Sequence, residues 1–168
     1  MSTNNSILKY ATYEVVFREF PDEITLAINI SNCPNNCPGC HSSYLAQDIG
    51  TELTTEELDN LITSNDAITC IGFMGGDNSP KSVVKLSQYI KEKYPHLKTG
   101  WYSGREIFPL NHGTFNYIKL GPYIEEFGPL DNPNTNQVMW ENIGGTEMNP
   151  IFRDITKQMQ VKQYLKFE

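Results

Sequence analysis

Short apolar segments alternate with amphipathic segments of helical length along most of the chain. The apolar segments are rich in β-branched and aromatic residues, which predicts strands. They are residues 24–30, 67–74, 98–103 and 116–120. Two helices are predicted between the first three strands: one begins at the capping box of residues 54–57, and the other begins at Ser79-Pro80 and ends before Pro95.

Strands that alternate with helices and are apolar on both faces indicate parallel β/α units. The chain has 168 residues, which is too short for a closed eight-fold barrel of ~200–250 residues. We therefore expect an α/β fold with a partial, open barrel, whose parallel strands carry helices on the outside. We expect one domain over residues 1–168, with its core at about 24–125. Residues 126–168 are less regular, and 151–167 are predicted to form either a helix or a pair of strands.

The charge of the chain limits its partners. The net charge is -7, the pI is about 5.0, and no basic run is present. Nucleic acids and anionic membranes require clustered Lys and Arg, so neither is expected as the main partner. The N-terminal segment lacks the pattern of a signal peptide, and no apolar run approaches the ~20 residues of a membrane span. We expect a cytoplasmic protein, in which cysteines are ligands or reactive groups more often than disulfides.

Three cysteines and a histidine lie together in residues 33–41, and three kinds of site compete for them. Cys37-Pro-Gly-Cys40-His41 has the C-x-x-C-H pattern of attached haem, but it leaves Cys33 unexplained and comes without an export signal. A structural zinc site needs four ligands, with His41 or Cys70 as the fourth. The third possibility is an iron–sulfur cluster held by three thiolates, with one iron open to another ligand. Cys70 lies in an apolar run and is expected in the core.

Two other polar motifs follow predicted strands in the same way as the cysteines do. Gly75-Gly76-Asp77 comes after the second predicted strand, and Ser103-Gly104 lies at the end of the third. Sites in α/β proteins are built at the carboxyl ends of the parallel strands. The three loops are therefore expected to form one site.

The spacing Cys33-x3-Cys37-x2-Cys40 resembles the signature of the radical S-adenosylmethionine (SAM) enzymes, and residues 75–77 resemble their Gly-Gly-Glu motif. Two later motifs resemble the activating proteins (activases) of anaerobic, class III ribonucleotide reductase: Gly121-Pro122-Tyr123 and Thr135-Asn136-Gln137. Together these motifs cover roughly residues 24–140. The resemblance implies the partial barrel of the radical SAM enzymes.

The chain departs from that family's pattern at three places. Asp77 stands where Glu is usual. Residues 19–24 lack the Gly-Pro-Gly-x-Arg that many activases carry, which affects the expected docking surface. An acidic residue that is common in the fourth strand is missing from residues 117–120.

The resemblance also implies a role for each residue of the site. Cys33, Cys37 and Cys40 would ligate a [4Fe–4S] cluster and act through it in catalysis. Asp77 would pair with the ammonium of SAM, Ser103 would bind its carboxylate, and His41 would stack on its adenine. The residues expected to bind SAM are Gly39, Cys40, His41, Gly75, Gly76, Asp77 and Ser103.

The implied reaction is the reductive cleavage of SAM to methionine and a 5′-deoxyadenosyl radical. That radical would abstract a hydrogen from a glycine of the large subunit of anaerobic ribonucleotide reductase. A flavodoxin or ferredoxin would supply the electron. The alternatives are an activase of another glycyl radical enzyme such as pyruvate formate-lyase, a small radical SAM enzyme that acts on a metabolite and, more distantly, a zinc-binding interaction module.

Overall fold

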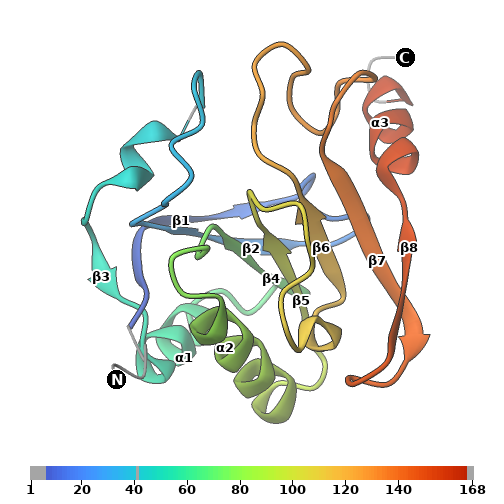
Figure 1. The fold of residues 1–168 in the computed structure, drawn as a ribbon. Coiled ribbons are helices and arrows are strands. Elements are labelled where there is room, and N and C mark those ends of the chain that lie inside the picture. Colours follow the sequence, from blue (N-terminus) through green and yellow to red (C-terminus); the bar gives the residue numbers. More distant parts are fainter. Residues whose placement is uncertain (1–6, 41, 166–168) are drawn as a thin grey trace.

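The computed structural model describes residues 7–40 and 42–165, which form one mixed sheet with helices (Figure 1). The strands are β1 (Lys9–Val16), β2 (Thr25–Ile30), β3 (Thr51–Glu52), β4 (Cys70–Met74), β5 (Lys98–Tyr102), β6 (Tyr117–Leu120), β7 (Val138–Gly145) and β8 (Pro150–Asp154). The helices are α1 (Thr55–Thr63), α2 (Pro80–Lys93) and α3 (Thr156–Leu165), with 3₁₀ turns η1 (Ser43–Ala46) and η2 (His112–Thr114).

The strand order is β3-β1-β2-β4-β5-β6-β7-β8. The four strands predicted from the sequence are β2, β4, β5 and β6, and they pair in parallel. The outer strands β1, β3, β7 and β8 pair antiparallel and were not predicted individually. The structure is thus α/β with an open mixed sheet, and its assignment to a radical SAM-type partial barrel stays a prediction. The last segment contains both a strand, β8, and a helix, α3.

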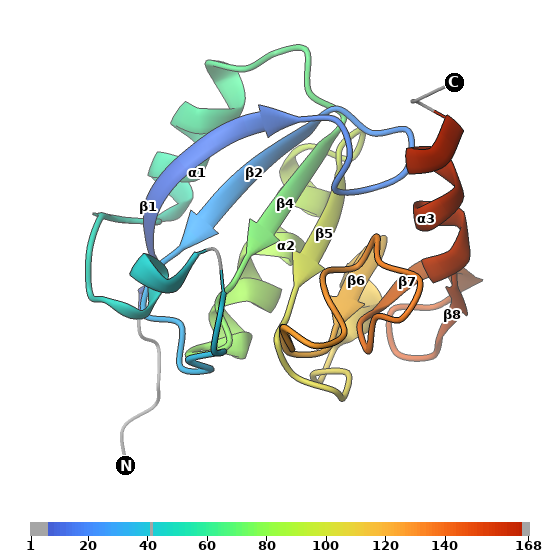
Figure 2. The same cartoon turned by 90° about the horizontal axis from the view of Figure 1, so that it is seen from above.

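The two predicted helices are present on one face of the sheet (Figures 1 and 2). Thr54 caps α1, because its Oγ1 accepts a hydrogen bond from the Glu57 backbone N–H at 3.1 Å. Ser79 is the N-cap of α2, as predicted, but its hydroxyl lies 2.7 Å from that of Ser82 and makes no side-chain cap bond. Pro80 still begins α2, where its missing N–H costs nothing.

The alternation of side chains along the central strands gives the two faces of the sheet different compositions. Ile71, Phe73, Trp101 and Ile118 belong to the main core with α1 and α2. On the opposite face lie Cys70, Gly72 and Met74 of β4, Lys98, Gly100 and Tyr102 of β5, and Tyr117 and Lys119 of β6. This second face carries glycine and polar residues and is only partly covered, which leaves room for a site. None of the helices in the described ranges combines the length and apolarity needed to span a bilayer.

Phe20, from the loop between β1 and β2, covers the middle of this second face. Its buried ring stacks on Tyr117 at 5.2 Å between centroids and meets Tyr102 edge-on at 5.4 Å. The ring lies over Gly72 and Gly100, where an added Cβ would be 3.0 Å or less from it. The two glycines therefore create the space that Phe20 fills.

Candidate functional site

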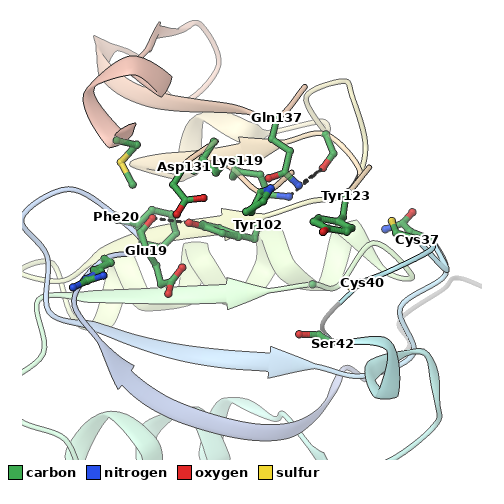
Figure 3. Close-up of a pocket in the computed structure, with 18 of the residues that line it drawn as sticks. Glu19, Phe20, Cys37, Cys40, Ser42, Tyr102, Lys119, Tyr123, Asp131 and Gln137 are labelled. Atoms are coloured by element: carbon green, nitrogen blue, oxygen red, sulfur yellow. Dashed lines mark hydrogen bonds between the residues drawn. The ribbon is translucent and has the colours of Figure 1, made fainter. Parts of the chain in front are cut away.

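A cavity of about 770 Å³ opens on the glycine-bearing face of the sheet, at the carboxyl ends of the parallel strands. Figure 3 shows Cys37 and Cys40 at one end of this pocket and Glu19 and Phe20 at the other. Tyr102 lies between the two ends. The volume is typical of a site for a small molecule of cofactor size.

The cysteine loop follows β2 and contributes Cys33, Cys37 and Cys40 to the pocket lining, as free and partly exposed thiols. Two residues of the loop, Asn36 and Gly39, adopt positive φ angles of 46° and 75°. These left-handed conformations, together with the bond from the Cys40 N–H to the Cys37 carbonyl at 3.1 Å, curl the chain back on itself. As a result all three thiols reach one cavity.

Asp77 lies behind the cysteine loop and is 3% exposed. Its carboxylate accepts three hydrogen bonds: from Asn35 Nδ2 at 2.7 Å, from Ser103 Oγ at 2.6 Å and from the Gly104 N–H at 2.8 Å. The Arg105 guanidinium also donates to the Asp77 backbone carbonyl at 3.2 Å. Asp77 therefore joins the three loops that the sequence places after β2, β4 and β5.

Gly75 and Gly76 have φ angles of 112° and 104°, which favour glycine. Gly75 lines the pocket, and its carbonyl accepts a hydrogen bond from Trp101 Nε1 at 2.8 Å. Gly76 is not among the lining residues, and a Cβ there would lie 2.5 Å from Val83 of α2. Gly75 therefore lies where the predicted close approach of the backbone to a ligand would occur, and that role stays a prediction, whereas Gly76 makes room for a helix.

Three further residues were predicted to bind SAM. Ser103 is buried and bonded to Asp77, and it does not line the pocket. Gly39 lies beside Glu125, whose carboxylate would be 3.0 Å from an added Cβ. His41 lies outside the described residues. Their binding roles stay predictions.

Lys119 on β6 is a pocket residue that the sequence reasoning missed. Its side chain is buried, and Nζ donates to the carbonyls of Ser103 and Gly121 at 3.1 Å each. Burial lowers the pKa of Lys119 to about 8, while negative charge on Asp77 and on the three site cysteines opposes this change. A buried ammonium at this place favours anionic groups in the pocket. The alternation of β6, with Ile118 in the main core, is the sequence signal that could have found it.

The two later motifs of the resemblance meet at the same pocket. Asn136 Nδ2 donates to the Pro122 carbonyl at 3.0 Å, and Gln137 Nε2 lies 3.5 Å from the Gly121 carbonyl. Gly121, Tyr123 and Gln137 line the cavity. These two segments therefore form one wall of the site, facing the cysteine loop (Figure 3).

The donors of the pocket fit an iron–sulfur cluster in kind and number. Three thiols come from one loop of turn-forming residues, and thiolates are the ligands such clusters take. In residues 7–40 and 42–165, no three Cys, His, Asp or Glu side chains are already close enough to hold a metal ion together. A cluster does not require that convergence on one ion, because each of its thiolates binds a different iron.

Comparison with known proteins gives one match. The family described as "4Fe-4S single cluster domain" matches residues 24–120, which is more than half of the chain. The matched segment runs from just before β2 to the end of β6 and contains the three cysteines of the pocket. No curated protein and no solved structure matches the chain significantly.

Proposed function

The chain belongs to the family of 4Fe–4S single cluster domains, and we propose that it is a radical SAM activating enzyme. In this proposal, Cys33, Cys37 and Cys40 hold the cluster, and the protein generates the glycyl radical of anaerobic ribonucleoside-triphosphate reductase. One observation carries the proposal: a single loop offers three thiols, and no fourth, to a pocket large enough for a cosubstrate.

When bound, a cluster with three thiolate ligands supplies an electron for the cleavage of SAM and an iron that the cosubstrate's amino and carboxylate groups can reach. The residues of the chain bind and orient. Gly75 allows close approach at the cysteine end, and the Lys119 ammonium favours an anionic group beside it. Phe20 and Tyr102 give the rest of the pocket an aromatic lining, which limits water around a reactive species.

The number of cysteines favours the reductase as the partner. Activases of pyruvate formate-lyase often carry additional cluster sites. This chain has four cysteines. Three of them line the pocket, and Cys70 is fully buried at the first position of β4. Burial also raises the pKa of the Cys70 thiol well above its usual range, so it is a poor ligand. No cysteine is left for a second cluster.

The test is the formation of a glycyl radical on a partner protein. The reconstituted chain is reduced, mixed with SAM and an anaerobic ribonucleotide reductase from the same source, and examined by electron spin resonance. We expect a glycyl radical doublet, which should disappear when the reductase carries Ala in place of its radical glycine. A glycyl radical doublet that forms with pyruvate formate-lyase but not with the reductase would support an activase of pyruvate formate-lyase instead. SAM cleavage without a radical on either protein would contradict the activase role.

A further inference from the structure

We propose that Asn35 is a positioning residue of the cluster site: its side-chain amide joins Cys33 to Asp77, and so fixes the first thiolate and raises the reduction potential of the cluster. This inference rests on the cluster site of the proposed function, and it does not depend on SAM or on the partner protein. It also gives Asp77 a role in holding the loop, in addition to the predicted contact with a ligand ammonium.

The amide nitrogen of Asn35 has two acceptors within reach. Nδ2 lies 2.7 Å from Asp77 Oδ2 and 3.7 Å from Cys33 Sγ. An amide group carries two N–H donors, so one nitrogen can serve the carboxylate and the sulfur together. Asn35 lines the pocket along with both of its partners. The thiol that begins the cluster motif is thus connected to β4 through one side chain.

Asp77 is a fixed anchor for this connection. Its carboxylate is buried and also accepts short bonds from the Ser103 hydroxyl and the Gly104 N–H, at 2.6 and 2.8 Å. Bonds to an ionised carboxylate are shorter and stronger than neutral ones. The neighbouring loop is shaped for Asn35 as well, because a Cβ on Gly104 would lie 2.5 Å from Asn35 Nδ2. Three strand-end loops therefore determine where the Asn35 amide lies.

The expected consequence is electrostatic. Hydrogen bonds to cluster sulfurs are among the features that set reduction potential, because they stabilise the more negative, reduced state. An N–H bond from Asn35 to the Cys33 thiolate should therefore raise the potential. Loss of the amide should lower the potential and leave the three ligands in place.

The experiment compares Asn35→Leu with the control substitution Asn29→Leu on β2. Among the contacts of the described residues, the side-chain amide of Asn29 bonds only to Thr12. Each protein is reconstituted anaerobically, its iron content is measured, and the cluster is titrated with reductant by spin resonance. We expect unchanged iron content in both, and a midpoint potential shifted to more negative values in Asn35→Leu alone. Asp77→Ala removes a negative charge from beside the cluster as well as the anchor of the amide, so the potential of Asn35→Leu against Asn29→Leu is the direct test of the bond. Equal potentials in Asn35→Leu and the wild type would overturn the inference.

Hydrogen exchange of the metal-free proteins decides the matter if Asn35→Leu binds no cluster. Asn35→Leu should speed exchange in residues 33–40, Asp77→Ala should speed it in 33–40 and 103–105, and Asn29→Leu should leave both segments unchanged. Unchanged exchange in residues 33–40 of Asn35→Leu would overturn the inference. SAM cleavage by the wild type is measured separately, so a shifted potential without cleavage would count against the proposed function alone.

Discussion

Gly100→Ala is the substitution whose effect can be worked out most fully from the contacts of the pocket floor. Gly100 lies on β5 beneath Phe20, and a Cβ there would be 2.2 Å from Phe20 Cζ and 2.6 Å from both Cε atoms. An ordinary contact begins at 3.4 Å, so the ring has to move by roughly 1 Å. Phe20 is fully buried between Tyr102 and Tyr117 and cannot move freely.

Two opposing contributions set the size of the effect on the free energy of unfolding. Overpacking a filled core costs about 1–3 kcal/mol. Replacing Gly by Ala at a position without positive φ, such as Gly100, restricts the unfolded chain and returns about 0.4–1 kcal/mol. We therefore expect Gly100→Ala to destabilise the metal-free protein by about 1–2 kcal/mol. Because Phe20 lines the pocket, the same shift should also narrow the cavity.

The assay is urea denaturation of Gly100→Ala in the wild type and in a Phe20→Ala background. Phe20→Ala alone should cost about 3–5 kcal/mol, and it removes the atoms that the new methyl group would meet. In that background Gly100→Ala should be neutral or slightly stabilising. Equal destabilisation of both backgrounds would refute the reasoning, because the cost would then not come from Phe20.

Three further predictions concern other parts of the chain. Thr54→Ala should destabilise the protein by about 1 kcal/mol through loss of the α1 cap, measured by thermal denaturation. The neighbouring Thr55 is exposed, so Thr55→Ala should leave the stability unchanged, and equal destabilisation by the two substitutions would contradict the cap. Burial lowers the pKa of Lys119 to about 8, so the unfolded chain binds more protons than the folded chain between that pH and 10.5. The stability of the wild type relative to Lys119→Met should therefore rise by about 3 kcal/mol from about pH 7 to about pH 11 in urea titrations, and a constant difference would refute it. Cys37→Ala should abolish the brown absorbance of the reconstituted protein and Cys70→Ala should retain it; loss in both would place Cys70 in the site.

The sequence was sufficient for the parallel centre of the fold because most residues of β2, β4, β5 and β6 are buried and only Lys98 is exposed. It was insufficient for the flanking strands. In β1 the residues from Thr12 to Val15 are all exposed, and in β7 the exposed end includes Gly144 and Gly145. Such strands are defined by pairing with a neighbour, which the local pattern of apolar residues does not reveal.

The candidate site shows the same division. The cysteine spacing and the strand-end positions predicted that Cys33, Gly75 and Asp77 would come together, and they line one pocket. The contact of Asn35 with Asp77 joins residues 42 positions apart. The position of Lys119 depends on which face of β6 lines the pocket. The first contact depends on the arrangement of the whole sheet, which spacing along the chain cannot give. For Lys119, alternation along β6 separates its side chain from that of Ile118, and only the assembled sheet shows which of the two faces carries the site.

The central claim is tested most directly by the reductive cleavage of SAM. The chain is reconstituted anaerobically with iron and sulfide, reduced and mixed with SAM, and the products are separated by chromatography. The account predicts 5′-deoxyadenosine and methionine in equal amounts from the wild type, and none from Cys33→Ala, Cys37→Ala or Cys40→Ala. A reducible [4Fe–4S] cluster that yields no 5′-deoxyadenosine would contradict the radical SAM assignment, and zinc binding without iron uptake would contradict the cluster itself.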